Sequence, residues 1–233
     1  RLPVVGNDDG IIDEASAAEM VEYAVSRGIN YFDTAWGYHG GNSETAMGKI
    51  LEKYPRESFY LASKFPGYDL TNMPKAEEIF ERQLEKCRVG YFDFYLFHNV
   101  CEMNIDAYLD SKYGIYEYLL KQKENGRIRH LGFSAHGGYD TMKRFLEAYG
   151  EKMEFCQLQI NYIDWDFQDA KKKAELLKEY GIPVWVMEPL RGGKLAALSS
   201  EDEAALKELR PEEKIPAWAF RFLQSLPEVK MIL

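Results

Sequence analysis

The stretch Ile29-Asn30-Tyr31-Phe32-Asp33-Thr34-Ala35-Trp36-Gly37-Tyr38 decides the fold that the rest of the sequence predicts. Ile29 to Phe32 have the apolar and aromatic character of a strand that is buried on both faces. Asp33 places a carboxylate where the apolar run ends, and the phenol of Tyr38 follows five residues later. A carboxylate at the end of a strand, close to a phenol, is either a structural cap or one half of an acid–base pair.

The same order, a strand and then a helix, repeats along the chain. Strands are predicted over residues 29–33, 59–63, 92–97, 128–133, 155–162, 183–187 and 229–233. Helices are predicted over residues 12–27, 43–54, 74–88, 115–125, 139–149, 167–180, 201–209 and 216–225. In the first of these helices, Ser16 and Glu19 form a capping-box pattern, and Met20 and Val21 lie on the apolar face.

Strands that alternate with helices indicate a parallel sheet with right-handed crossovers. Eight such units close into a (β/α)8 barrel, which typically needs ~250 residues. Only residues 1–5 could be the remnant of a strand before the first helix, and the last predicted strand is buried. An open doubly wound sheet is the alternative, but no G-x-G-x-x-G follows the early strands. The sequence therefore predicts one α/β domain over residues 1–233, a TIM barrel clipped at the first strand and after the eighth.

Composition and charge narrow the range of partners and compartments. A net charge of −9 and a pI near 5.1 argue against a nucleic acid or an anionic membrane as partner. Cys87, Cys101 and Cys156 are isolated in sequence, so neither a zinc site nor a disulfide framework is expected. No apolar run reaches the ~18 residues of a membrane span. We therefore expect a cytoplasmic protein.

Polar residues stand at or near the predicted strand ends, and in a barrel these ends meet at one mouth. They are Asp33, Lys64, His98, Ser134, Gln157 or Gln159, and Glu188. Each alone has a structural explanation, because polar residues commonly end strands where the backbone reaches the surface. Together they place an acid, a base, an imidazole and a phenol at one mouth, which favours a catalytic site.

The chemistry of this set is specific. A tyrosine phenol has an ordinary pKa of ~10, and an ammonium group within ~4–6 Å lowers that pKa by about 1–3 units. Lys64 would act on Tyr38 in this way, and Asp33 would hold the ammonium in place. Tyr38 would then be a general acid, and His98 would help orient a carbonyl oxygen. The set is wrong for zinc and contains no nucleophile poised on a base.

The chain resembles the aldo-keto reductase superfamily over nearly its whole length. The motifs that carry the resemblance are Phe32-Asp33-Thr34-Ala35-Trp36-Gly37-Tyr38, Asn42-Ser43-Glu44, Leu61-Ala62-Ser63-Lys64, Asp93-Phe94-Tyr95-Leu96-Phe97-His98, Ile128-Arg129-His130-Leu131-Gly132-Phe133-Ser134, Gln157-Leu158-Gln159-Ile160-Asn161-Tyr162 and Met187-Glu188-Pro189-Leu190-Arg191-Gly192-Gly193-Lys194-Leu195. The resemblance implies a (β/α)8 barrel, NADPH or less often NADH as cofactor, and reversible reduction of a carbonyl by hydride transfer. The family's catalytic four fall on Asp33, Tyr38, Lys64 and His98.

The same resemblance implies roles for further residues. Ser134 and Gln157 match residues that bind the nicotinamide carboxamide, and Met187 stands where many members stack an aromatic ring. The loop that matches the pyrophosphate-binding loop contains Glu188, Leu190, Arg191 and Gly192. Trp36 and Asn99 would line the substrate pocket, with Tyr108 and Tyr113 as lids. No metal site is implied; a microbial subgroup has longer members with an iron–sulfur segment, and this chain lacks its cysteines.

Two other functions remain open at the level of sequence. The first is a regulatory or sensor subunit that binds NADPH without catalysis, against which the four intact catalytic positions argue. The second is a Schiff-base aldolase or dehydratase that uses Lys64. Such a lysine needs a lowered pKa, whereas a partner at Asp33 would keep it charged.

Overall fold

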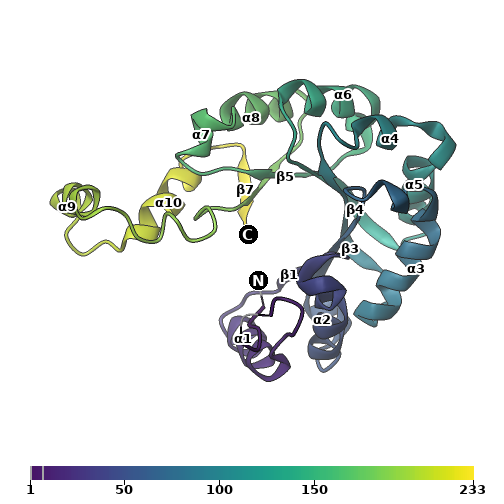
Figure 1. The fold of residues 1–233 in the computed structure, drawn as a ribbon, viewed down its shortest axis with the longest axis horizontal. Helices are drawn as coiled ribbons and strands as arrows, with labels where there is room; N and C mark the ends of the chain where they lie inside the picture. The colour runs from purple at the N-terminus through teal and green to yellow at the C-terminus, as the bar shows by residue number, and fades with distance from the viewer. Residues whose placement is uncertain (1, 7) are drawn as a thin grey trace. The chain divides into compact units, whose positions relative to one another are not determined.

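The structure is a computed structural model that describes residues 2–6 and 8–233 (Figure 1). The chain separates into two compact units, Arg1–Phe133 and Ser134–Leu233. Within the described residues, seven strands follow one another in chain order, from β1 to β7, and helices separate them. The expectation of a single domain over residues 1–233 stays a prediction.

The first unit contains β1, β2, β3 and most of β4, with the helices that connect them. Its elements are α1 (Glu14–Ser26), β1 (Tyr31–Asp33), η1 (Tyr38–Gly41), α2 (Ser43–Leu51), η2 (Arg56–Ser58), β2 (Tyr60–Phe65), η3 (Leu70–Lys75), α3 (Ala76–Cys87), β3 (Phe92–Val100), α4 (Ile105–Leu109), η4 (Ser111–Tyr113), α5 (Ile115–Glu124) and β4 (Ile128–Ala135), which ends in the second unit. β1 pairs with β2 and β2 pairs with β3, both in parallel. Helices α2, α3 and α5 lie along the outside of these strands (Figure 1).

Helix α3 shows why these segments form the core of the first unit. Its apolar side chains recur at helical spacing, and Ile79, Phe80, Leu84 and Cys87 are all buried. The Phe80 ring contacts the rings of two β3 residues at their edges, with centroids 5.9 Å from Phe92 and 5.1 Å from Tyr95. This cluster fixes α3 against the strand that carries His98.

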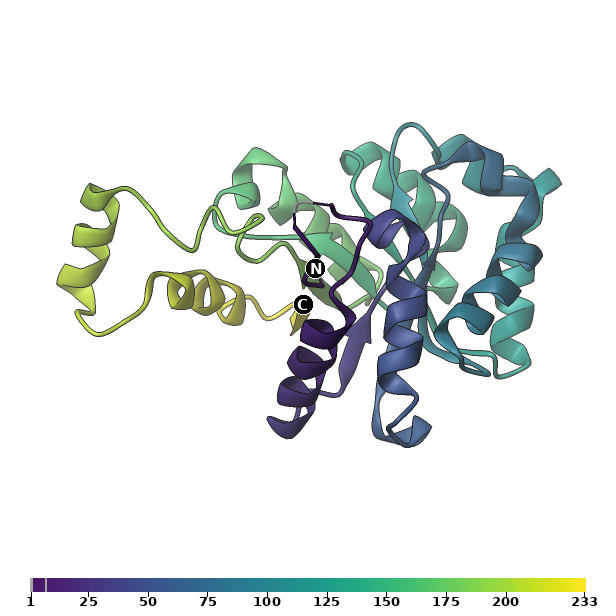
Figure 2. The same cartoon turned by 60° about the horizontal axis from the view of Figure 1, so that its bottom comes forward.

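The second unit repeats the alternation. Its elements are α6 (Tyr139–Tyr149), η5 (Gly150–Lys152), β5 (Cys156–Gln159), α7 (Asp164–Phe167), α8 (Ala170–Glu179), β6 (Val184–Met187), α9 (Ser200–Leu209), α10 (Ile215–Gln224) and β7 (Val229–Ile232). β5 pairs with β6 and β6 pairs with β7, both in parallel. Helix α9 lies at the end of a long excursion between β6 and α10, away from the strands (Figure 2).

Several expectations about the strands are wrong in detail. Lys64, His98 and Ser134 lie inside β2, β3 and β4, and do not follow the strands directly. β1 begins only at Tyr31, and Ile29 is 54% exposed because it stays in the connection that follows α1. The last strand, β7, is half-buried rather than buried.

The N-terminal segment and the helix after it also differ from the expectations. Val4 forms an isolated antiparallel bridge with Ile12, so the described part of residues 1–5 contributes a hairpin-like turn and no parallel strand. Asp13, one turn earlier than the expected capping box, accepts the hydrogen bond from the Ser16 amide that caps α1. Met20 is 53% exposed, and the buried face of α1 contains Val21 as expected.

The predicted helix over residues 167–180 corresponds to α8, which begins only at Ala170, whereas Phe167 is the last residue of α7. Asp169 has a left-handed φ of 51°, which interrupts the helical backbone between them. In the part of the chain that the structure describes, no helix is long and apolar enough to cross a membrane. Within the same residues, no cluster of three His, Cys, Asp or Glu side chains could hold a metal ion.

Candidate active site

Lys64 is the centre of the candidate active site in the first unit. Its side chain is 1% exposed, and its Nζ donates hydrogen bonds to Asp33 Oδ1 and, at 2.9 Å, to the Thr34 carbonyl. The register of β1 and β2 explains this pairing, because Asp33 lies opposite Ala62, two residues before Lys64 on the same face of β2. The Lys64 Nζ also lies 4.8 Å from the centroid of the Tyr38 ring.

The charge of Lys64 follows from these contacts. Burial alone lowers the pKa of the ammonium, but the carboxylate of Asp33 and the phenol of Tyr38 outweigh it, so the pKa is raised above its ordinary value. Lys64 is therefore charged at neutral pH. This direction contradicts the lowered pKa that a Schiff-base lysine needs, so the structure argues against the aldolase alternative.

Tyr38 and His98 complete the set of four. Tyr38 begins η1, directly after the turn residue Gly37, and is 40% exposed. His98, from the interior of β3, is buried, and its ring meets the Tyr38 ring edge-on with centroids 5.9 Å apart. The structure thus brings the four predicted residues together, while their catalytic roles stay a prediction.

Two further residues were expected to line the substrate pocket. Trp36 is half-buried, and the Lys86 ammonium lies 4.7 Å from the centroid of its indole ring. Lys86 in turn donates a 2.8 Å hydrogen bond to the fully buried Glu44. Asn99 is half-buried near the end of β3 with a left-handed φ of 59°, and its carbonyl accepts a 2.8 Å hydrogen bond from Asn104.

The expectation that Tyr108 forms a lid is wrong. The side chain is 1% exposed, and its hydroxyl donates a 2.8 Å hydrogen bond to the carbonyl of His98. The segment after β3 folds inward as the short helix α4, whose apolar face buries Ile105 and Tyr108. Tyr108 is therefore a support beneath the candidate site, whereas Tyr113 is half-buried in η4.

Tyr68 belongs to the same site and was missed in the sequence. It lies in the turn after β2, and its ring meets the His98 imidazole edge-on with centroids 5.3 Å apart. It belongs to none of the motifs that carry the family resemblance, and the last motif residue before it is Lys64. The only signal available was its position four residues beyond a lysine at the expected strand end.

The residues expected to bind the cofactor all lie in the second unit. Ser134 and Gln157 are buried, at the end of β4 and within β5, and Met187 is half-buried at the end of β6. Glu188, Leu190, Arg191 and Gly192 form consecutive turns directly after β6. Three of these turn positions, Glu188, Arg191 and Gly192, have left-handed φ values of 58°, 49° and 64°.

Asp164 and Asn161 hold this loop in place. Asp164 is fully buried, and its Oδ1 lies 3.3 Å from the Nε of Arg191, whose side chain is 30% exposed. Asn161 donates hydrogen bonds of 2.6 Å to Asp164 and 3.2 Å to the carbonyl of Glu188. The loop therefore presents a guanidinium and turn backbone amides, a donor set that fits a phosphate group. Asn161 belongs to the motif Gln157–Tyr162, but no pattern in the sequence marks its contact with Asp164.

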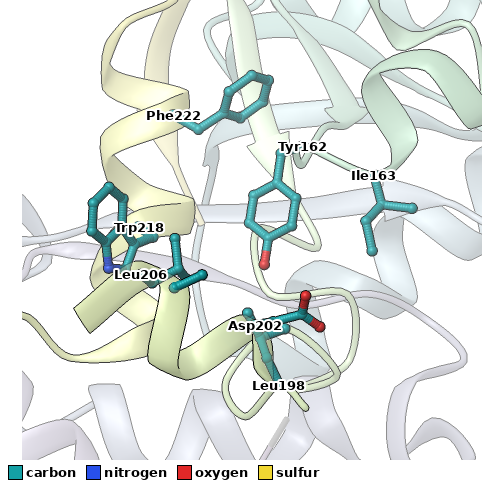
Figure 3. Close-up of a pocket in the computed structure, with 8 residues that line it drawn as sticks. Tyr162, Ile163, Leu198, Asp202, Leu206, Trp218 and Phe222 are labelled. Atoms are coloured by element: carbon teal, nitrogen blue, oxygen red, sulfur yellow. The ribbon is translucent and has the colours of Figure 1, made fainter. Parts of the chain in front are cut away.

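A cavity of about 550 Å³ also lies within the second unit, between α9, α10 and the segment after β5 (Figure 3). Its lining is mostly apolar and aromatic, with Trp218 and Phe222 from α10 and Leu206 from α9. The hydroxyl of Tyr162 points toward Asp202 (Figure 3). Burial raises the pKa of that phenol, and the charge of Asp202 adds to the effect. None of the predicted site residues lines this cavity.

The comparison with known proteins matches this arrangement to one family. The model of the "Aldo/keto reductase family" matches residues 4–230. The chain belongs to this family. The match confirms the family that the motifs predicted. Members of this family are NAD(P)H-dependent oxidoreductases.

Two curated relatives are identical to this chain at about a quarter of the aligned residues. "Probable aldo-keto reductase 1" of Glycine max is 27% identical over 190 residues, which are 78% of this chain and 52% of the relative. The "NADH-specific methylglyoxal reductase" of Escherichia coli K12 is 26% identical over 211 residues, 83% of this chain and 62% of the relative. The chain thus spans only 52% to 62% of the length of these two relatives.

The fold is also that of solved aldo/keto reductases. The holo form of aldo-keto reductase AKR11C1 from Bacillus halodurans superposes with a TM-score of 0.76 at 23% identity. The match covers 94% of this chain and 76% of that protein. The predicted fold class, an incomplete (β/α)8 barrel of the aldo/keto reductase type, is therefore confirmed.

Proposed function

We propose that the protein reduces an aldehyde or a ketone to the alcohol, with NADPH, or alternatively NADH, as hydride donor. The observation that carries the proposal is the buried Lys64 ammonium between the Asp33 carboxylate and the Tyr38 phenol. Structural ion pairs are common, but this one holds a charged group against a half-exposed tyrosine. A cation in that position stabilises the phenolate that forms when the phenol gives up its proton.

In the proposed reaction Tyr38 donates its proton to the carbonyl oxygen. The Lys64 ammonium stabilises the phenolate that remains, and Asp33 keeps the ammonium charged and oriented. His98 lies against the Tyr38 ring and would orient the carbonyl oxygen beside the phenol. The nicotinamide cofactor, when bound, supplies the hydride that adds to the carbonyl carbon.

The second unit would hold that cofactor. We assign the carboxamide contacts to Ser134 and Gln157 by family resemblance, with Met187 packing on the nicotinamide face. Arg191, held by Asp164, would bind a phosphate together with the turn backbone at Glu188, Leu190 and Gly192. The fixed guanidinium and the left-handed turns support this assignment. NADPH is proposed from the family, whereas the Escherichia coli relative is described as specific for NADH.

The test uses the full-length protein, NADPH and a generic aldehyde such as 4-nitrobenzaldehyde. The protein should oxidise NADPH only when the aldehyde is present, and Tyr38→Phe should lower kcat by about 100- to 10,000-fold, the contribution of a general acid. Tyr60→Phe, at an exposed tyrosine on β2 outside the site, is the matched control and should keep the parent rate.

Other outcomes would refute parts of the proposal. Full activity of Tyr38→Phe would show that Tyr38 is not the acid. Tight NADPH binding without turnover of a broad carbonyl panel would favour a sensor subunit instead. Trapping of a carbonyl compound on Lys64 by borohydride would favour the Schiff-base alternative, which the raised pKa of Lys64 argues against.

A further inference from the structure

Tyr68 places a second phenol at the candidate active site. Its ring and the Tyr38 ring both contact the His98 imidazole edge-on, with centroids 5.3 Å and 5.9 Å from it. The two tyrosines are similarly exposed, at 37% for Tyr68 and 40% for Tyr38. One imidazole is therefore flanked by two phenols that both reach solvent.

The fold holds Tyr68 in this position. The turn that carries it begins with a 2.9 Å hydrogen bond from the Gly67 amide to the Phe65 carbonyl. Gly67 lies directly on the buried Tyr108, since a Cβ at Gly67 would meet the Tyr108 hydroxyl at 2.1 Å. That hydroxyl is bound to the carbonyl of His98. The Tyr68 turn and the His98 strand are thus fixed to the same buried side chain.

The Tyr68 hydroxyl lies beside the loop that carries the proposed acid. A Cβ built on Gly37 would meet the Tyr68 Oη at 2.2 Å, so only glycine leaves room for the phenol there. Gly37 directly precedes Tyr38 in the chain. The two hydroxyl-bearing side chains therefore approach the same loop, one from within it and one from the turn after β2.

The Tyr68 phenol is a hydrogen-bond donor at neutral pH. Burial raises its pKa, and the carboxylates of Glu44 and Asp69 and the neighbouring Tyr38 add to the effect. Among the residues that the structure describes, its hydroxyl makes no hydrogen bond to another side chain or to the backbone. Its proton is therefore available to a ligand.

We propose that Tyr68 is a specificity-determining residue that donates a hydrogen bond to a second oxygen beside the reacting carbonyl. The substrate class is then the α-hydroxy carbonyl and α-dicarbonyl compounds. This inference rests on the proposed function, in which Tyr38 binds the carbonyl oxygen itself. A substrate that covers Tyr68 with a methyl group leaves a buried hydroxyl unpaired, and sites built to bind a substrate oxygen reject such analogues.

The test compares two ketones of almost the same shape. Hydroxyacetone and 2-butanone differ only by a hydroxyl in place of a methyl group next to the carbonyl. The full-length protein should have the higher kcat/KM for hydroxyacetone, and Tyr68→Phe should lower the hydroxyacetone-to-butanone ratio by about 2- to 13-fold, the value of one neutral hydrogen bond. Tyr60→Phe should leave the ratio unchanged.

A merely structural role of Tyr68 would lower kcat/KM equally for both ketones and leave the ratio unchanged, which would overturn the inference. Loss of all turnover in Tyr68→Phe would overturn it too, because Tyr68 would then be the acid. If the parent protein reduces 4-nitrobenzaldehyde but neither ketone, the proposed function stands, and if it reduces none of the three compounds, the proposed function fails. Ligand-observed NMR then gives the binding affinities of both ketones for the parent and for Tyr68→Phe. The hydroxyacetone-to-butanone ratio of these affinities decides the role of Tyr68.

Discussion

Replacing Asp33 by asparagine tests the electrostatic core of the proposed site. The substitution keeps the size of the side chain but removes the negative charge that holds Lys64, whose side chain is 1% exposed. Removing one partner of a buried ion pair costs about 3–5 kcal/mol, because the other charge stays buried without compensation. Asp33 is 21% exposed on its side chain, so the lower end, about 3 kcal/mol at pH 7, is expected.

The sign of the pH dependence makes the test sharper. In the parent the pKa of Lys64 is raised above its ordinary 10.5, so its contribution to stability is complete below pH 10.5 and is lost as the pH rises through the higher folded value. In Asp33→Asn burial is the strongest remaining effect and should bring the folded pKa below 10.5. The folded state then binds fewer protons than the unfolded state, and its stability rises with pH.

The free energy of unfolding should be measured by urea titration at several pH values between 7 and 10, for the parent and the variant. The free energy of unfolding of the variant is subtracted from that of the parent at each pH. Buried thiols such as Cys87 and Cys156 are present in both proteins, so their contribution to the pH dependence cancels in this difference. We expect a deficit of about 3 kcal/mol at pH 7 that shrinks as the pH rises.

Glu14→Gln serves as the control. It breaks the ion pair with Lys49, in which both side chains are about half exposed, and should change stability by less than about 1 kcal/mol. A deficit in Asp33→Asn that does not change with pH would refute the account of Lys64. A variant of Asp33 that is as stable as the parent would also refute this account of Lys64.

The remaining predictions concern the phosphate loop and the contact of α2 with α3. Arg191→Met should raise the KM for NADPH by about 10- to 100-fold with a far smaller change in kcat, because it removes a charge-assisted hydrogen bond. Steady-state kinetics measures both constants, and an unchanged KM would contradict the phosphate assignment. Gly48→Ala should lower the free energy of unfolding by about 1–3 kcal/mol through overpacking, since its Cβ would meet the Lys86 carbonyl at 2.4 Å. Gly90→Ala, where a Cβ meets nothing within 4 Å, is the urea-denaturation control, and equal losses in both variants would exclude overpacking as the cause.

The alternation of strands and helices could be predicted because it depends on local periodicity. The apolar stripe of α3 and the strand before His98 carry that signal in a few adjacent residues. Burial of individual residues was less predictable, since Met20 and Ile29 are apolar yet more than half exposed. An apolar side chain faces the core only if another element covers it, and the sequence does not say which faces are covered.

The four proposed catalytic residues could be predicted because each belongs to a motif near a strand end. Tyr68 and Asp164 could not, since their positions depend on how a turn packs. Tyr68 reaches His98 only because Gly67 lies on Tyr108, and Asp164 reaches Arg191 only because left-handed turns bring that loop back. Tyr108 was misassigned for the same reason, because a loop tyrosine that folds inward has no mark in the sequence.

Strand β2 separates a structural ion pair from the proposed catalytic one. Ser63 and Lys64 are adjacent, so their side chains point to opposite faces of the strand. Ser63 binds the buried Glu44, at 2.6 Å, which the Lys86 ammonium neutralises.

Lys64, on the other face, binds Asp33, while its own carbonyl accepts a 3.0 Å hydrogen bond from Gln83 in the Glu44 network. The network therefore fixes the backbone of Lys64 without using its ammonium. Disruption of the Glu44 face should loosen the strand, whereas loss of Asp33 should change the charge next to Tyr38. The first perturbation acts on stability, whereas the second acts on stability and also on the proposed chemistry, although the two carboxylates bind to neighbouring residues.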